Sequence, residues 1–250
     1  MEGGQAVEDV TVRNLGKSFD GKPVFSNLDM TFVNGEVTAV LGPSGRGKTT
    51  LIRVLCGLER QDVGDVAMPE GIGCSVVFQE PRLLPWLTVE GNLRYCMDGE
   101  GAGRALEILS GLGLDGFKDR YPTSLSGGEQ QRVNLARALA SPERVLLMDE
   151  PFNSIGLGMK AELLPLLRER IASERKTVVL VTHSPVDVAL MADRFYLMND
   201  DGKGADGPFT LEIGKAGRKL DDDELGQQVH KLMKLMASLG KGARDPDELK

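Results

Sequence analysis

Residues 35–58, GEVTAVLGPSGRGKTTLIRVLCGL, carry the strongest indication of the fold of this chain. The first seven residues predict a short strand, and KTTLIRVLCGL has the apolar period of a helix. Between them, GPSGRGKT at 42–49 fits the pattern G-x-x-x-x-G-K-[ST]. Glycines in such a loop let backbone N–H groups close around phosphate oxygens, beside the N–H donors of the helix start. Because strand, loop and helix occur together, we interpret the stretch as a phosphate-binding loop and not as a glycine-rich turn.

Two side chains of this loop bring chemistry of their own. Lys48 can reach the β- and γ-phosphates of a nucleotide, and the Thr49 hydroxyl can ligate Mg²⁺. The residues that we expect at the phosphates are Gly42, Pro43, Ser44, Gly45, Arg46, Gly47, Lys48, Thr49 and Thr50.

A second apolar run, RVLLMDEP at 144–151, ends in two carboxylates. Asp149 at the strand end can hold Mg²⁺ through water. Glu150 just past it can polarise an attacking water, as phosphoryl transfer to water requires. Beside the phosphate-binding loop, we prefer this interpretation to that of two solvated acids at the end of a strand.

Further short β-branched runs surround these two. They predict strands followed by polar residues and separated by helices, which favours an α/β fold with parallel strands covered on both faces. In such sheets, ligands bind beyond the carboxyl ends of the strands. The runs are VEDVTVRNL (7–15), NLDMTFV (27–33), SVVF (75–78), KTVVLVT (176–182) and PFTLEIG (208–214).

Between residues 83 and 140 the strand pattern fades, and GRALEILSGLGL and EQQRVNLARALA predict helices. We interpret this part as a helical subdomain inserted into the sheet domain. Near the C-terminus, apolar residues repeat at helical spacing, with acids before them and lysines among them. This stripe predicts a helix that packs on its own domain, and a partner-binding helix is the alternative. The stripe consists of Leu225, Val229, Leu232, Met236 and Leu239.

Composition excludes several classes of protein. A net charge of -7 and a pI near 5.1 argue against a nucleic-acid binder. No apolar run approaches the roughly 18 residues of a membrane-spanning helix, and the acidic start MEGGQAVEDV lacks the features of a signal peptide. The three cysteines are widely spaced, which favours reduced thiols over a disulfide framework or a zinc site. We therefore expect a cytoplasmic protein.

SLSGGEQQRVNLARALA at 124–140 adds a second glycine-rich helix start. Ser126 followed by Glu129 matches a capping box. A capped start with two glycines, Gly127 and Gly128, also presents free N–H donors to an anion. Both interpretations can hold together.

The motifs as a set resemble those of the ATP-binding-cassette (ABC) ATPases. LSGGEQQR at 125–132 is similar to the signature motif of that family. The phosphate-binding loop, Gln79, the signature, LLMDEP and His183 in VTHS occur in the family's order. The resemblance covers about residues 7–214. It implies a P-loop NTPase fold with a mostly parallel core sheet, an N-terminal antiparallel β subdomain and an inserted helical subdomain.

The resemblance also implies roles for individual residues. Gln79 would sense the membrane partner and the metal-bound water, His183 would contact the γ-phosphate, and Phe19 would stack on adenine; an ordinary buried Phe is the alternative. The implied cofactors are ATP and Mg²⁺. The catalytic set is Lys48, Gln79, Glu150 and His183, and the metal set is Thr49, Gln79 and Asp149.

In this family two such domains dimerise head to tail. The signature of one chain, here Ser126, Gly127, Gly128 and Glu129, closes over ATP held by the glycine-rich loop of the other. One departure is notable: where the family usually continues with Ser-Ala-Leu-Asp after DEPF, this chain has Asn153-Ser154-Ile155-Gly156. The missing Asp removes a contact that couples the two sites, which predicts weaker hydrolysis or looser coupling but not loss of ATP binding.

VVFQEPRLLPWLTVEGNL at 76–93 resembles the ATP-binding subunits of bacterial importers for nitrate, sulfonates, taurine and related solutes. There the stretch faces the membrane subunit, which predicts that residues 83–86, including Trp86, are exposed; the alternative places Trp86 and the leucines in the core. A soluble ABC ATPase with a role outside transport is the rival class. It is disfavoured because the chain has one cassette and no long coiled-coil insertion.

The importer resemblance implies partners and a location. The partners would be a second copy of the chain, transmembrane permease subunits and an extracytoplasmic solute-binding protein, with no nucleic acid. The chain would be peripheral on the cytoplasmic face of the inner membrane. We divide it into a nucleotide-binding domain at 1–216, with the helical subdomain at about 83–141, and a C-terminal helical tail at 217–250.

Overall fold

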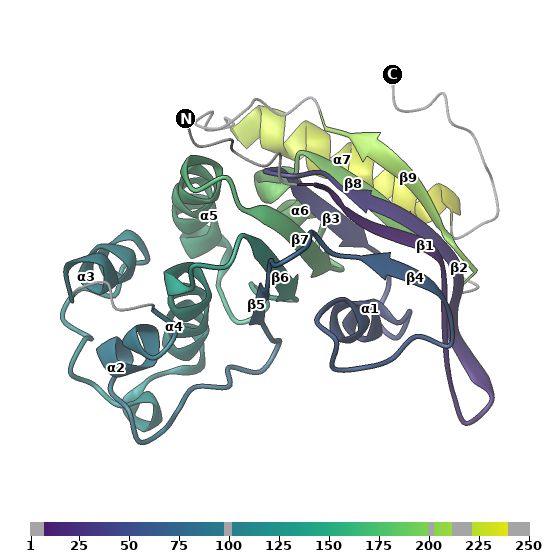
Figure 1. The fold of residues 1–250 in the computed structure, drawn as a ribbon. Helices are drawn as coiled ribbons and strands as arrows, with labels where there is room; N and C mark the ends of the chain where they lie inside the picture. Colours follow the sequence, from purple (N-terminus) through teal and green to yellow (C-terminus); the bar gives the residue numbers. More distant parts are fainter. Residues whose placement is uncertain (1–7, 98–101, 200–202, 212–221, 240–250) are drawn as a thin grey trace, which may run out of the picture.

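Two β-sheets flanked by helices form the structure, a computed structural model that describes residues 8–97, 102–199, 203–211 and 222–239 (Figure 1). In these residues the larger sheet has six strands in the order β5-β6-β7-β3-β8-β9. Their bounds are β3 Val37–Leu41, β5 Cys74–Val77, β6 Val145–Asp149, β7 Thr177–Thr182, β8 Arg194–Met198 and β9 Ala205–Thr210.

All neighbouring pairs in this sheet are parallel except β8 and β9, which are antiparallel. Every residue of β3, β6 and β7 is buried, because both faces of the sheet are covered. The prediction of a mostly parallel sheet covered on both faces is confirmed.

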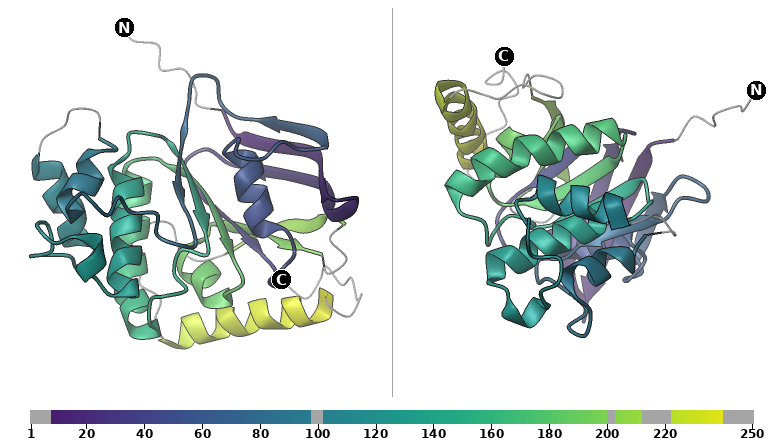
Figure 2. Two further views of the ribbon diagram at one scale, coloured as in Figure 1. Left: turned by 90° about the horizontal axis from the view of Figure 1, so that it is seen from below. Right: turned by 90° about the vertical axis from the view of Figure 1, so that its left-hand side faces the viewer.

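The two faces of the large sheet carry different layers. Val40, Leu147 and Val179 pack with α1 (Lys48–Leu55) and the smaller sheet, whereas Ala39, Met148 and Leu180 pack with the remaining helices. Figure 2 shows α1 and α7 on opposite sides of the sheet. The helices of the second layer are α4 Gly127–Ala140, α5 Leu157–Ser173, α6 Pro185–Met191 and α7 Asp222–Leu239.

The smaller sheet is antiparallel, as the resemblance implied, with the order β2-β1-β4. A two-residue turn joins the first two strands, where Asp20 and Gly21 have φ of 50° and 73°. This Asp-Gly pair suits the positive φ that a tight hairpin requires. The bounds are β1 Val10–Phe19, β2 Lys22–Phe32 and β4 Val63–Ala67.

The inserted helical part follows β5. Helices α2 and α3 pack against α4, and a short 3-10 turn leads into α4 (Figure 1). The bounds are α2 Val89–Arg94, α3 Ala102–Gly111 and the turn Pro122–Ser124. These helices lie within the segment of about 83–141 that we propose as the subdomain.

Helix α7 packs on its own domain. Leu232 is buried, and Leu225, Val229 and Met236 pack against the main core cluster beside α6. The favoured interpretation of the apolar stripe is therefore confirmed for these residues; the side chain of Leu239 and the proposed boundary at residue 217 lie outside the described residues.

The structure adds elements that the pattern did not predict. Strands β4 and β8 were missed because VGDVA is polar and glycine-containing and RFYLM is short. The helices α2, α5 and α6 were also missed. The last strand is β9 at Ala205–Thr210 and not 208–214, of which residues 212–214 lie outside the described part. In the described residues, no helix is long and apolar enough to span a membrane.

Candidate active site

The loop between β3 and α1 has a backbone that only glycine allows at its key position. Gly47 has φ of 83°, and a Cβ there would lie 2.6 Å from Val24 Cγ1 and 2.8 Å from Phe25 Cδ1. Gly47 is also the N-cap of α1, with no side-chain cap and no acidic residue in the first turn. The N–H groups at the start of α1 therefore remain available to an anion.

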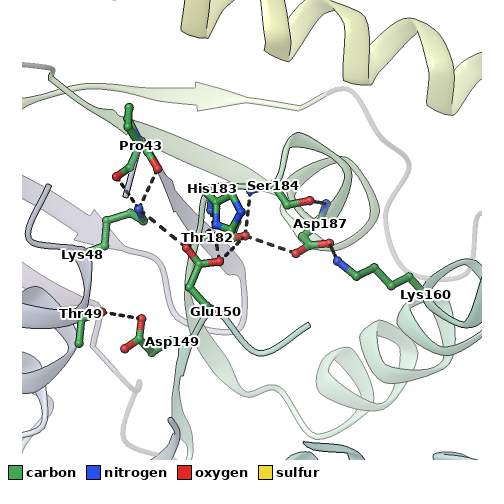
Figure 3. A network of polar contacts seen from close by, with 11 residues as sticks. Pro43, Lys48, Thr49, Asp149, Glu150, Lys160, Thr182, His183, Ser184 and Asp187 are labelled. Carbon is green, nitrogen blue, oxygen red and sulfur yellow. Dashed lines mark hydrogen bonds and ion pairs between the residues drawn. The ribbon is translucent and has the colours of Figure 1, made fainter. Parts of the chain in front are cut away.

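Lys48 lies at the buried floor of this loop. Its Nζ donates to the carbonyl oxygens of Gly42 at 2.7 Å and Pro43 at 2.8 Å, and lies 3.8 Å from Glu150 Oε1 (Figure 3). Burial lowers the pKa of Lys48, while the carboxylates of Glu150 and Asp149 act against that shift. The ammonium group is thus held by two neutral backbone carbonyls beside the expected phosphate position.

Thr49 and Asp149 form an oxygen pair across the site. The Thr49 hydroxyl donates to Asp149 Oδ1 at 3.1 Å, joining the first turn of α1 to the end of β6. Burial raises the pKa of Asp149, and the hydrogen bond from Thr49 opposes that rise. A hydroxyl and a carboxylate are oxygen ligands of the type that Mg²⁺ prefers, so the pair fits this ion.

Glu150 has an unusual backbone conformation for a residue with a long side chain, with φ of 46°. Its N–H donates to Val181 O at 2.9 Å, and its carboxylate is buried. Oε1 lies 2.8 Å from Nδ1 of His183, whose side chain is half exposed. The β6 and β7 strand ends thus bring this carboxylate and this imidazole together.

One cavity of about 390 Å³ connects these groups. Most of the residues that line this cavity were predicted from the sequence. They belong to three strand ends and to the start of α1. Val24 and Asn153 also line it, and sequence reasoning missed both as site residues; Asn153 lies two residues past the DEP motif, whereas nothing in the sequence marks Val24. The lining residues are Val24, Ser44, Gly45, Gly47, Lys48, Thr49, Thr50, Gln79, Glu150, Asn153 and His183.

Phe19 lies outside this lining, at the hairpin end of β1. The residue is 42% exposed, so it is not an ordinary buried Phe. Lys17 Nζ lies 4.9 Å from the ring centroid. The exposed ring leaves the stacking role open to test.

The signature forms a separate helix start. Ser126 caps α4: its N–H donates to Glu129 Oε2 at 2.7 Å, and the Glu129 N–H donates to Ser126 Oγ at 3.4 Å. The hydrogen bond from the Ser126 backbone, more than that from its hydroxyl, lowers the pKa of Glu129. The predicted capping box is confirmed.

The signature and the phosphate-binding loop do not meet within one chain. None of the described residues 125–132 lines the 390 Å³ cavity, and α1 and α4 lie on opposite faces of the large sheet. Helix α4, which begins with the signature, is instead tied to the strand ends: Gln131 Nε2 donates to Pro151 O at 2.9 Å, and Asn134 Nδ2 donates to Phe78 O at 3.1 Å.

The stretch after Gln79 presents one large apolar side chain. Trp86 is 70% exposed, whereas Leu83 and Leu84 are half-buried and Leu83 packs against the core. The expectation of a wholly exposed 83–86 segment is therefore wrong for the leucines. Asn92 of α2 fixes the loop, since it accepts from Leu84 N–H and donates to carbonyls of residues 84, 87 and 88.

Comparison with known proteins agrees with this geometry. The family described as "ABC transporter" matches residues 25–153. The chain is 42% identical over 194 residues to the aliphatic sulfonates import ATP-binding protein SsuB 2 of Rhodococcus jostii, covering 76% of this chain and 78% of that protein. It is 37% identical to a protein of the same description, SsuB 1, from Nocardia farcinica, covering 94% of each.

Solved structures show the same fold. The dimeric structure of MJ0796, described as a bacterial ABC transporter cassette, superimposes with a TM-score of 0.70 at 26% identity, covering 81% of this chain and 100% of that one. A post-hydrolysis dimer of the same cassette, bound to ADP and Pi, matches equally well. Together with the phosphate-binding loop and the signature, these matches establish that the chain belongs to the ABC transporter family, as one of its ATP-binding cassettes.

Proposed function

We propose that this chain hydrolyses ATP to drive the import of a small sulfonate-like solute through a partner permease. The observation that carries the proposal is that Lys48, Glu150 and His183 line one cavity together with Thr49 and Gln79. Relatives described as aliphatic sulfonates import ATP-binding proteins support the direction of transport and the class of solute.

ATP binding starts from the loop. The N–H groups at the start of α1 receive phosphate oxygens, and Lys48 exchanges the carbonyls of Gly42 and Pro43 for the β- and γ-phosphates. A phosphate is a far better partner for an ammonium group than a carbonyl. Phe19, at the edge of the antiparallel sheet, stacks on adenine.

Thr49 and Asp149 would hold Mg²⁺, and Gln79, which lines the same cavity from the loop after β5, would be a further ligand. When bound, Mg²⁺ neutralises charge on the β- and γ-phosphate oxygens. The ion keeps several waters and needs only one or two protein ligands beside substrate phosphates, which is what this donor set offers.

Glu150 acts as the general base. Its carboxylate takes a proton from the attacking water, whose oxygen bonds to the γ-phosphorus as the bond to ADP breaks, giving ADP and inorganic phosphate. His183 Nδ1 lies 2.8 Å from Glu150 Oε1 and holds this carboxylate in place, while the exposed side of the ring contacts the γ-phosphate.

Two chains complete each site. The exposed start of α4, with Ser126, Gly127 and Gly128, closes over the ATP bound to the loop of the partner chain, while Glu129 holds Ser126 in place. The N–H donors of the signature then complement those of α1.

The surface around Trp86 docks on the permease at the cytoplasmic face of the inner membrane. A solute-binding protein outside the membrane would deliver the sulfonate-like anion. Exposure of a Trp on a loop fixed by Asn92 supports a protein contact at this place.

Replacement of Glu150 by Gln tests the mechanism. Glu150→Gln keeps the shape of the side chain and its place beside Lys48, so ATP binding persists. Steady-state turnover falls by at least about a hundredfold, the lower end of a general base's contribution, and an ATP-bound dimer accumulates. Glu162→Gln, on the exposed face of α5, is the matched control. Near-normal turnover of Glu150→Gln would remove Glu150 from this role.

A further inference from the structure

A buried ion pair of Lys160 and Asp187 lies next to Glu150 on the side of Thr182, and it has no role in the mechanism proposed above. Asp187 of α6 is fully buried, and its Oδ1 accepts a hydrogen bond from Lys160 Nζ at 2.7 Å (Figure 3). Lys160, in the first turn of α5, is also buried. Burying two charges is costly unless both are paired and hydrogen-bonded. We therefore ask what the buried pair of Lys160 and Asp187 contributes at this place.

Thr182 joins this pair to the catalytic carboxylate. Its hydroxyl oxygen lies 3.3 Å from Glu150 Oε2 and 3.3 Å from Asp187 Oδ2. The same oxygen accepts the N–H of Ser184 at 3.0 Å. A hydroxyl has a single proton, so it can be donated to Glu150 or to Asp187, but not to both.

Burial decides which carboxylate receives the proton. Asp187 Oδ2 lies in the interior, and the Thr182 hydroxyl is the donor within reach of it at 3.3 Å. Glu150 is also buried, but it is 7% exposed and lines the cavity, whereas Asp187 is 0% exposed and does not line it. Glu150 Oε2 also has a further weak donor in the His183 N–H at 3.4 Å. An acceptor left without a donor costs more in the interior than beside water.

We propose that Asp187, anchored by Lys160, is a positioning residue that takes the Thr182 proton and leaves Glu150 Oε2 free for the attacking water. The proposal rests on the role of Glu150 as the base. If Thr182 donated to Glu150 instead, the carboxylate would be held toward the interior and would accept a proton from water less readily. Asp187 therefore contributes to turnover without touching the substrate.

Asp187→Asn reverses the hydrogen bond without changing the volume. Lys160 binds Oδ1, so the amide nitrogen takes the place of Oδ2 and donates to Thr182 Oγ1. With the Ser184 N–H, both lone pairs of that oxygen are then occupied, and the Thr182 proton turns to Glu150. We expect kcat to fall about tenfold, the change that one hydrogen bond to a charged group produces, while KM for ATP and equilibrium ATP binding stay within about twofold.

A second substitution separates positioning from mere stability. Adding Thr182→Val to Asp187→Asn removes the misdirected proton, so kcat of the double variant rises several-fold above that of Asp187→Asn. Its melting temperature falls, because another buried hydrogen bond is lost. A purely structural role predicts the opposite for kcat, since activity would then follow stability.

Asp193→Asn is the matched control. Asp193 pairs with Arg168, so the same carboxylate-to-amide change disturbs another ion pair on α5, away from the cavity. It is expected to lower the melting temperature and leave kcat unchanged.

If Asp187→Asn does not fold, Lys160→Met gives the same test. Without the hydrogen bond from Lys160 that anchors Oδ1, Asp187 no longer holds Oδ2 in place for the Thr182 hydroxyl, which turns to Glu150. The value of kcat then falls, and adding Thr182→Val raises it. The inference is overturned if either folded variant keeps normal kcat, or if Thr182→Val fails to raise it. If Glu150 is not the general base, Glu150→Gln itself is expected to turn over normally. That result distinguishes failure of the proposed function from failure of this inference.

Discussion

Glu150, the proposed base, shows how neighbours hold a single residue in an unfavourable conformation. Its φ of 46° is sparsely populated for a residue with a Cβ. The N–H bond to Val181 O keeps this conformation, and His183, Thr182 and Lys48 surround the carboxylate. Strain at the end of β6 is therefore balanced by contacts from β7 and α1, which turn the side chain toward the cavity.

Gly156 stands where the family resemblance leads us to expect an Asp. It is the N-cap of α5 without a side-chain cap, with φ of −65°, and no atom lies within 4 Å of the position that a Cβ would take. An Asp side chain fits there and would accept an N–H of the first turn, so Gly156→Asp is expected to stabilise the fold by a few tenths to about 1 kcal/mol.

The same substitution tests coupling between the two sites. If the missing Asp weakens that coupling, Gly156→Asp also increases the amount of ATP-bound dimer trapped in the Glu150→Gln background. Thermal unfolding and size-exclusion chromatography measure the two effects, with Gly156→Ala as the control that adds a Cβ but no acceptor. Equal melting temperatures for the Ala and Asp variants would contradict the capping argument.

At the scale of elements, the loop before α2 is fixed in shape and exposed at its tip. Asn92 is buried and bonds to three carbonyls and one N–H of the loop, while Trp86 remains 70% exposed. Trp86→Glu is therefore expected to leave folding and ATP binding intact and to abolish co-purification with the permease or stimulation by it.

A matched substitution gives this prediction its control. Tyr95, just past α2, is 73% exposed, so Tyr95→Glu places the same charge on the same subdomain outside residues 79–87. Unfolding of Trp86→Glu, or equal losses in both variants, would speak against a docking role specific to Trp86.

Helix α7 offers a test of packing. Leu232 is 1% exposed in the core cluster, whereas the adjacent Met233 is 57% exposed. Leu232→Ala leaves a cavity and is expected to lower the free energy of unfolding by about 2–4 kcal/mol. Met233→Ala is expected to change it by less than about 0.5 kcal/mol. Denaturant unfolding measures both; if Leu232→Ala were as mild as Met233→Ala, α7 would not be an integral part of the domain in solution.

At the scale of the whole molecule, the large sheet separates the two glycine-rich helix starts. The start of α1 and the start of α4 belong to opposite layers, and the cavity includes only the first. Oriented N–H groups act on an anion only at short range. A signature that contributes to the site therefore has to come from a second chain.

Mixing two inactive variants tests this arrangement. Homodimers of Lys48→Ala and of Ser126→Arg contain no intact site. A mixed dimer has one site with both defects and one with a normal loop and a normal signature, so mixing is expected to restore one competent site. The readout is ATP trapping in the Glu150→Gln background, because turnover could require both sites. Trapping that stays at the level of the separate variants, despite proven mixed dimers, would reject the composite site.

Short stretches of sequence were enough to predict the local parts of this protein. The phosphate-binding loop, the capping box at Ser126 and the buried strands β3, β6 and β7 are each encoded in a few consecutive residues. Backbone conformation and capping depend on neighbours along the chain, so period and spacing predict them. Strand β4 was not predicted, because its sequence is polar, contains glycine and has no apolar run of its own, although it pairs with β1.

Which of these parts meet depends on tertiary packing. Parallel strands linked through helices bring Lys48, Gln79, Glu150 and His183 to one cavity, and Val24 contributes to its wall. The same packing pairs Lys160 of α5 with Asp187 of α6. The same packing buries part of Leu83 while exposing Trp86, and it places the signature on the face away from the loop. Such contacts depend on how layers pack and on which face a side chain occupies, and no pattern of neighbouring residues contains that information.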